Sequence, residues 1–375
     1  MKKFAKMSLV AAVAVAGMTS ASAADLAEAI KGVDVSGQFR LRYEDTATDT
    51  AGNNDNGNAN KSDVEIEINA KVPVNDMVTA VFKIDNANDD TNNVDKGAVT
   101  IEDYYFQYVN GATTVNFGQQ NIPGRMTDAA QGDGVVALYN AGAFTVGAAG
   151  FITQSASNTT TNSNVGPYEG YDLYSVIAMG NAGPVALLGQ YADVPDLGNA
   201  YNVKADATVG PVMVGVEYSE TDLDNSSAEY DTFKAYVSGS IEALSAKLTY
   251  ASTGKDGSGS YHAVASNDYA ASAETPAEFL LWQLGSATKA DLSIVALDAS
   301  YALTDKVTLR AAYADGDMKE SATEKQDLTE ILGQVSYKMS SNLNTYFRIS
   351  QYEVDYTTGN DTEKVRGRVE VQYTF

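Results

Sequence analysis

The segment TEKVRGRVEVQYTF, residues 362–375, ends the chain and decides its fold class. Successive side chains of a β-strand point to opposite faces, so an alternating segment has one apolar face and one polar face. The apolar or small positions are Val365, Gly367, Val369, Val371, Tyr373 and Phe375, and they alternate with Lys364, Arg366, Arg368, Glu370, Gln372 and Thr374. A soluble sheet shares this pattern, but a last strand that ends on an aromatic residue, in a chain with an export signal, is typical of a transmembrane β-barrel.

The first residues carry that export signal. Three lysines within the first six residues precede an apolar run over 7–17, and the small-residue site Ala21-Ser22-Ala23 follows. The run is about half of the roughly 20 residues that a membrane-spanning helix needs. We therefore predict a cleaved signal peptide over 1–23 and a single barrel domain over 24–375. No later stretch is apolar enough to span as a helix, so a closed barrel is the remaining membrane fold.

The composition excludes several classes of function. Beyond residue 23 the chain has 22 basic and 49 acidic side chains, a net charge of −27, which argues against a nucleic-acid partner. The absence of cysteine excludes a cysteine nucleophile and a cysteine-ligated metal. The 23 tyrosines suit strands flanked by aromatic girdles, and no linker divides the chain into domains.

Alternation with a period of two residues begins at Val33 and returns along the chain, as in 63–72, 201–209, 307–313 and 343–349. Eight short turn signals occur at 73–76, 110–112, 140–142, 181–183, 210–211, 241–244, 303–306 and 340–342. Nine longer polar stretches occur at 45–61, 87–98, 120–134, 153–170, 193–199, 221–228, 252–290, 316–326 and 355–361. These connections predict an all-β antiparallel barrel of eighteen strands, with sixteen as the alternative count. The short turns and long loops alternate as in a bacterial outer-membrane barrel.

Three segments near the N-terminus resemble a known family: DLAEAIK at 25–31, VDVSG at 33–37 and RLRY at 40–43. They are similar to the mature N-terminus of the Campylobacter-type major outer membrane porin family. The segment FGQQNIP at 117–123, followed by Thr127-Asp128, is similar to that family's entry into its inward-folded third loop. The resemblance implies an eighteen-stranded trimeric channel for ions and small hydrophilic solutes.

Six of the seven arginines fall on the polar faces of predicted strands at the two ends of the chain. These are Arg40, Arg42, Arg310, Arg348, Arg366 and Arg368. Closure of the barrel sets the first and last strands side by side. Arg40 and Arg368 are each seven residues from the start or end of their strands, and Arg42 and Arg366 are each nine away. Barrel stagger shifts these levels, but we expect the four arginines to share one band of the wall. An arginine that faces lipid at mid-bilayer costs about 2–4 kcal/mol, so we predict that all six face the lumen.

We expect acidic partners from the third loop, 120–134, which contains Asp128 and Asp133. A loop folded into the lumen would set these acids opposite the basic wall and create a transverse field that selects solutes by charge. The alternative is that the arginines pair with lumenal acids on neighbouring strands and stiffen the wall. The acids available for that role are Glu44, Asp63, Glu65 and Glu67.

The sequence also offers residues typical of two other kinds of site, a calcium site and a hydrolytic site. The Asn/Asp-rich stretches 53–58 and 85–95 offer the oxygen ligands that calcium takes, but they lack the spacing of a calcium loop. Asp128, Asp133 and Glu278 stay candidates for a bound calcium, with Glu274 beside them, and we expect no required cofactor. His262 lies near Ser258 and Ser260 in Gly/Ser-rich sequence that would not hold a catalytic geometry, so we predict no enzyme.

The apolar patch 276–284 is expected to form a short helix or a cap over a neighbouring loop or subunit.

These patterns predict an outer-membrane porin that permits passive diffusion and forms a homotrimer in outer-membrane lipid. The net charge favours weak cation selectivity, although lumenal arginines oppose it. An energy-coupled transporter is disfavoured because no plug domain precedes the first predicted strand. Three alternatives remain: an adhesive barrel with polar loops such as 155–164, a channel specific for one solute, and a secreted soluble β-protein.

Overall fold

The computed structural model describes residues 32–51, 57–86, 99–127, 130–154, 172–224, 227–228, 230–257, 281–285, 289–321 and 324–375. The predicted signal peptide, 1–23, lies outside these residues. Among the described residues there is no helix of the length and hydrophobicity that crosses a membrane.

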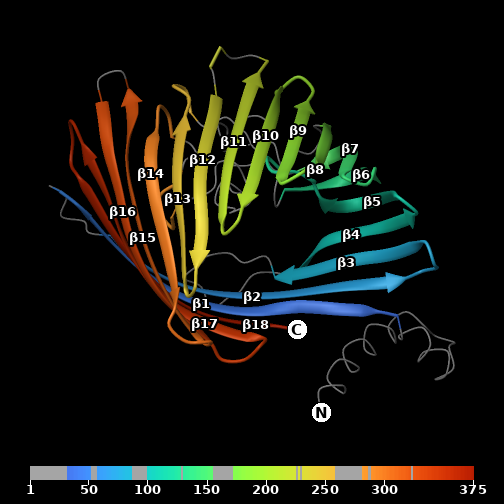
Figure 1. Cartoon of the computed structure of the whole chain (residues 1–375), viewed down its shortest axis with the longest axis horizontal. Coiled ribbons are helices and arrows are strands. Elements are labelled where there is room, and N and C mark those ends of the chain that lie inside the picture. The colour runs from blue at the N-terminus through green and yellow to red at the C-terminus, as the bar shows by residue number, and fades with distance from the viewer. Residues whose placement is uncertain are drawn as a thin grey trace.

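Eighteen antiparallel strands form one closed sheet (Figure 1). Each strand pairs with its neighbours in sequence, and β1 pairs with β18 to close the ring. The predicted eighteen-stranded barrel is therefore confirmed. The strands are β1 Asp34–Thr50, β2 Asn58–Pro73, β3 Val78–Asn86, β4 Val99–Asn110, β5 Thr113–Asn121, β6 Gln131–Asn140, β7 Phe144–Gln154, β8 Leu173–Ala182, β9 Val185–Val194, β10 Gly198–Val209, β11 Val212–Leu223, β12 Tyr230–Ile241, β13 Leu244–Thr253, β14 Ser293–Ala302, β15 Val307–Ser321, β16 Glu324–Lys338, β17 Leu343–Tyr356 and β18 Thr362–Thr374.

The eight short turns lie where the turn signals predicted them. Side-chain oxygens stabilise several of them by accepting backbone hydrogen bonds: Asn75 Oδ1 accepts from the N–H of Val78 at 3.0 Å, and Thr304 Oγ1 accepts from that of Val307 at 3.0 Å. Gly183 and Gly210 adopt φ values of 62° and 60° at two other turns. A side chain is disfavoured in that left-handed conformation, so glycine suits these positions.

Several long connections are shorter than the sequence suggested. The stretch 45–61 was expected to be a loop, yet β1 runs to Thr50 and β2 begins at Asn58. The stretch 316–326 is likewise almost all strand, with β15 ending at Ser321 and β16 beginning at Glu324. The polarity of these residues shows that both faces of the strands meet water there. The strands continue to pair there because pairing satisfies the hydrogen-bonding groups of the backbone, whether the side chains face lipid or water.

The outward face of the wall is apolar at mid-height. Phe117, Ile331 and Phe347 expose 65%, 58% and 50% of their surfaces on this side. Tyrosines lie at the edge of the apolar band nearer the long connections, where their hydroxyls donate to carboxylates on the same face. The pairs are Tyr174–Asp172 at 3.0 Å, Tyr218–Glu220 at 2.6 Å and Tyr313–Asp315 at 3.2 Å. An apolar belt with amphipathic rings at its border is the surface that a transmembrane barrel presents to lipid.

Two apolar clusters lie inside the barrel, where an aqueous lumen would favour polar residues. One surrounds Ile122 and Met126 of the β5–β6 connection, which are 2% and 0% exposed. The other surrounds Trp282 and Leu284 of the β13–β14 connection, which are 8% and 0% exposed. Each cluster holds a segment of a long connection against the inner wall.

Candidate permeation site

The seam between β1 and β18 sets acids opposite arginines. Arg42 pairs with Glu370 across the ladder, and Glu44 pairs with Arg368. The backbone N–H of Gly37 donates to the carbonyl of Phe375 at 3.1 Å, and the N–H of Phe375 donates back at the same distance. The stagger needed to close a tilted barrel sets Arg40 opposite Gln372, so Arg40 and Arg368 lie at neighbouring levels of the seam and not directly opposite each other.

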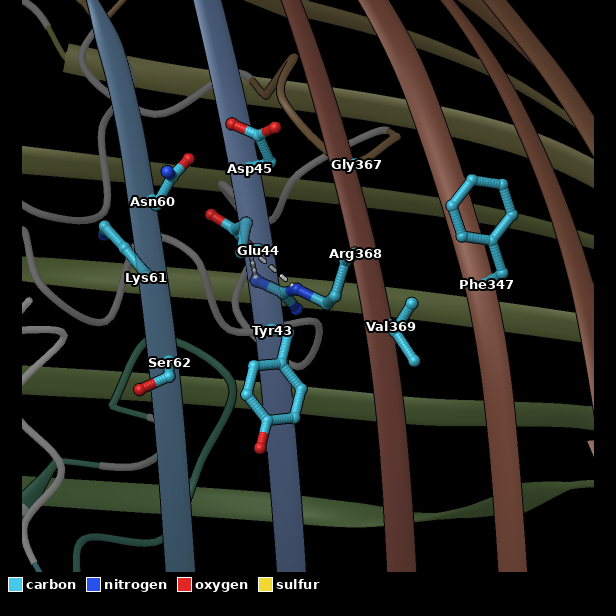
Figure 2. A pocket seen from close by; sticks show the side chains of 10 residues that line it. All are labelled: Tyr43, Glu44, Asp45, Asn60, Lys61, Ser62, Phe347, Gly367, Arg368 and Val369. Atoms are coloured by element: carbon cyan, nitrogen blue, oxygen red, sulfur yellow. Dashed lines mark hydrogen bonds and ion pairs between the residues drawn. The ribbon is translucent and has the colours of Figure 1, made fainter.

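Glu44 is the partner of two arginines. Its carboxylate accepts a hydrogen bond from Arg368 Nε at 2.7 Å and lies 2.6 Å from Arg366 Nη2. Figure 2 shows the Arg368 guanidinium reaching from β18 to Glu44 on the neighbouring β1. The shared carboxylate offsets the repulsion between two guanidinium groups on one strand face.

Arg40 and Arg42 are held by acids in the same way. Arg40 donates to Glu65 and lies 3.9 Å from Asp63, and Arg42 donates to Glu370 and lies 3.5 Å from Asp63. The alternative interpretation, pairing with wall acids, thus holds for Glu44, Asp63 and Glu65. Glu67 differs, since it pairs with Lys83 at 3.1 Å.

The last two of the six arginines differ from each other. Arg310 Nε donates to both oxygens of Asp298, at 2.9 and 3.0 Å. Arg348 Nε donates to the amide oxygen of Gln334 at 2.7 Å. Within the described part of the chain, Arg348 has no carboxylate within ion-pairing distance.

The β5–β6 connection folds inward, as predicted for the third loop. Arg125 donates from Nε and Nη2 to the two oxygens of Glu217 on β11, both at 2.9 Å. Gln190 of β9 accepts from the N–H of Met126 at 3.1 Å and donates to the hydroxyl of Thr127 at 3.1 Å. This loop therefore reaches β9 and β11, which lie three and five strands beyond β6 along the sheet.

Of the two acids assigned to this loop, Asp133 is described, and it forms none of the described ion pairs of the six arginines. It lies in β6, because the loop spans only 122–130. Asp128 lies outside the described residues. The described carboxylate partners come from the wall itself, and the role of Asp133 in the permeation path stays a prediction.

A second segment also lies inside the barrel. The carboxylate of Glu330 on β16, whose side chain is fully buried, accepts from three consecutive backbone N–H groups. They belong to Trp282 at 3.3 Å, Gln283 at 2.9 Å and Leu284 at 2.8 Å. The apolar patch was expected to cap a loop or a subunit. Its described residues, 281–284, instead pack on the inner wall.

Trp282 contacts three of the arginines. Its ring centroid lies 4.6 Å from the guanidinium carbon of Arg366, 5.0 Å from that of Arg348 and 5.1 Å from that of Arg368. These are cation–π distances. Sequence reasoning missed Trp282 and Glu330 as site residues. The sequence does contain an indication of this contact. Leu328 and Leu332 lie on the lumenal face of β16, and apolar side chains there indicate that another segment covers this part of the inner wall.

A separate lumenal region on β2–β4 is rich in acids. Lys83 Nζ lies 3.1 Å from Glu67 and 2.6 Å from Glu102. Asp103 accepts from Gln131 Nε2 at 3.1 Å, and one carboxylate oxygen of Asp85 is buried without a hydrogen-bond partner. Two of these four acids, Glu67 and Glu102, contact Lys83, the one lysine that the described contacts place among them.

The metal prediction stays a prediction. Among the described residues, no group of three or more histidines or acids is arranged to hold a metal ion. Asp128, Glu274 and Glu278 lie outside those residues, as do Ser258, Ser260 and His262.

An open pocket of about 920 Å³ lies at the seam (Figure 2). A Cβ at Gly367 would meet no atom within 4 Å, so this glycine leaves a gap in the outer surface. The lining combines outward Tyr43, Phe347 and Val369 with the seam pair Glu44 and Arg368. The pocket therefore belongs to the wall and not to the pore axis.

Comparison with known proteins agrees with this architecture. The family model described as Campylobacter major outer membrane protein matches residues 1–373. No curated protein sequence matches the chain.

Solved structures with the same fold are outer-membrane proteins at low sequence identity. Pseudomonas aeruginosa OccK8 (OprE) is 12% identical with a TM-score of 0.71, over 92% of this chain and 98% of that one. Pseudomonas aeruginosa OpdL is 12% identical with a TM-score of 0.71, over 91% and 99%. Pseudomonas aeruginosa OccK2 (OpdF), in complex with glucuronate, is 12% identical with a TM-score of 0.68, over 91% and 98%.

Proposed function

The chain belongs to the Campylobacter major outer membrane protein family and is an outer-membrane porin, and we propose that it is a passive, weakly cation-selective channel. Solutes move down their own gradients, and no catalytic step or cofactor is required. The six arginines and the two inward segments shape the route that solutes take.

The observation that carries this proposal is the balance of lumenal charge. Five of the six arginines are engaged by carboxylates of the wall, so their positive potential is largely offset. On β2–β4 the acids outnumber the nearby lysine, and residues 24–375 carry a net charge of −27. An excess of fixed negative charge along a pore raises the local concentration of cations.

Three further features complete the proposal. Residues 1–23 act as a signal peptide that is removed on export. The mature chain assembles as a homotrimer, which the family resemblance suggests. A calcium ion held by Asp128, Asp133 and Glu278 would relieve clustered negative charge.

The test is the reversal potential of single channels in planar bilayers under a KCl gradient. We expect a modest preference for K⁺ over Cl⁻. Replacing Arg40, Arg42, Arg366 and Arg368 by glutamine should increase this preference, because their carboxylate partners would remain unopposed. An unchanged reversal potential in the quadruple variant would show that these arginines do not face the permeating ions. A barrel without discrete open steps would instead favour the adhesive alternative.

A further inference from the structure

Arg348 lies in a cross-strand row of lumenal residues. The register places Arg310, Gln334, Arg348, Arg368 and Glu44 on adjacent strands from β15 to β1. Like charges directly opposite each other in a ladder are destabilising, and Arg348 stands opposite Arg368. Asp298 holds Arg310 and Glu44 holds Arg368, so Arg348 is the arginine of this row whose charge the described wall leaves uncompensated.

The Arg348 guanidinium is held in place by three neighbours. It lies over the rings of Tyr346 and Trp282, at 4.8 and 5.0 Å from their centroids, and its Nε donates to Gln334. Contacts with two aromatic rings and one amide restrict the rotation of the side chain.

Each of those neighbours is itself fixed by a hydrogen bond. The Tyr346 hydroxyl donates to Glu370 at 3.0 Å, and the backbone N–H of Trp282 donates to Glu330 at 3.3 Å. The amide of Gln334 donates to the Ser336 hydroxyl at 2.7 Å. The orientation of the Arg348 guanidinium is therefore set before any solute arrives.

The two Nη groups of Arg348 donate none of the hydrogen bonds that the described residues form, because the bond to Gln334 uses Nε. No hydrogen bond or ion pair of the described residues uses them, and they are not among the buried polar atoms without a partner. They face accessible space, and together they form the planar fork that matches a carboxylate in two parallel hydrogen bonds.

We propose that Arg348, oriented by Trp282, Tyr346 and Gln334, is a binding site for the carboxylate of small organic anions that pass through the channel. A bound carboxylate would supply the negative charge that the row lacks between Arg348 and Arg368. This inference rests on the proposed channel function, and it adds a solute class that overall cation selectivity does not predict.

The single tryptophan of the chain, Trp282, gives a binding signal that does not depend on conductance. Folded protein in detergent would be titrated with succinate against sodium chloride at equal ionic strength, with Trp282 emission as the readout. We expect a saturable change with succinate and none with chloride. In bilayers, succinate should also reduce the open-channel current.

Arg348→Lys and Arg310→Lys form a matched pair. Both variants keep the positive charge and lose the fork, but Arg310 is already occupied by Asp298. We expect Arg348→Lys to weaken succinate binding about tenfold, the effect of losing one charge-assisted hydrogen bond, and Arg310→Lys to change it less than about twofold. Heat-modifiable mobility on gels confirms that each variant is folded.

Equal succinate affinity in wild type and Arg348→Lys would overturn the proposal, as would the absence of a succinate effect on both emission and current. A saturable emission change in a protein that shows no channel steps would leave the site standing and contradict the channel function.

Discussion

Arg368 of β18 donates from Nε to the carboxylate of Glu44 on β1 at 2.7 Å, although the two residues are 324 positions apart in the sequence. The contact joins the first and last strands at the point where the barrel closes. It also brings a negative charge between Arg366 and Arg368, so one carboxylate at the closing seam neutralises both of these arginines.

Replacing Glu44 by glutamine should therefore affect both stability and selectivity. Removal of the shared partner should lower the free energy of unfolding by about 1–3 kcal/mol, because two arginines lose their charged acceptor. The reversal potential should shift toward anions. Asp45→Asn is the matched control, since Asp45 is adjacent, exposed and on the outward face. Equal effects of the two substitutions on reversal potential would contradict a lumenal role for Glu44.

The inward position of the third loop should depend on the Arg125–Glu217 pair. Arg125→Lys keeps the charge but cannot form both hydrogen bonds, so we expect a less firmly held loop. Single-channel recordings should show larger open-state current fluctuations than the wild type. Glu217→Gln should have the same effect. Quiet recordings from both variants would mean that the contacts of Gln190 hold the loop without the ion pair.

Glu330→Gln should release the 281–285 segment from the inner wall. The amide has one acceptor oxygen, and its NH₂ group would face backbone N–H donors, which should cost about 1–3 kcal/mol. The emission of Trp282 should shift to longer wavelength as the ring meets water. Asp327→Asn removes a charge from the exposed, outward face of the same strand and should leave the emission unchanged. A wild-type spectrum in Glu330→Gln would show that the apolar contacts suffice.

Two outward glycines near the seam should respond in opposite directions. A Cβ at Gly37 would lie 2.2 Å from the backbone oxygen of Glu67 and 2.8 Å from the ring of Phe375. We expect Gly37→Ala to destabilise the barrel by about 1–3 kcal/mol through overpacking. Gly367→Ala meets open space and should stabilise it by about 0.5–1 kcal/mol, because glycine loses more backbone entropy on folding. Urea unfolding of the two refolded variants measures the difference, and equal midpoints would refute this account.

The strand count followed from local signals. Alternation of side chains and the eight turn signals depend on the chemistry of a few consecutive residues, so they can be read without knowing what lies nearby. The limits of the long connections were less predictable. Polar residues in 45–61 indicate water and not the end of pairing, and β1 and β2 continue through most of that stretch.

The lumenal direction of the six arginines could also be predicted, because an arginine in lipid is costly wherever the strand lies. Their partners could not be predicted individually. Which acid meets Arg42 depends on the stagger between β1 and β18, and a shift of two residues would exchange Glu370 for another side chain. The acids were expected from the third loop, but the described partners belong to the wall.

The sequence by itself determined that strands alternate, where they turn and which face of each is polar, because these depend on near neighbours in the chain. Only the tertiary structure decided that Glu44 neutralises two arginines, that Trp282 lies against three, and that Arg348 keeps a free fork. Those outcomes depend on barrel stagger and on segments folding back through the lumen, which join residues tens to hundreds of positions apart.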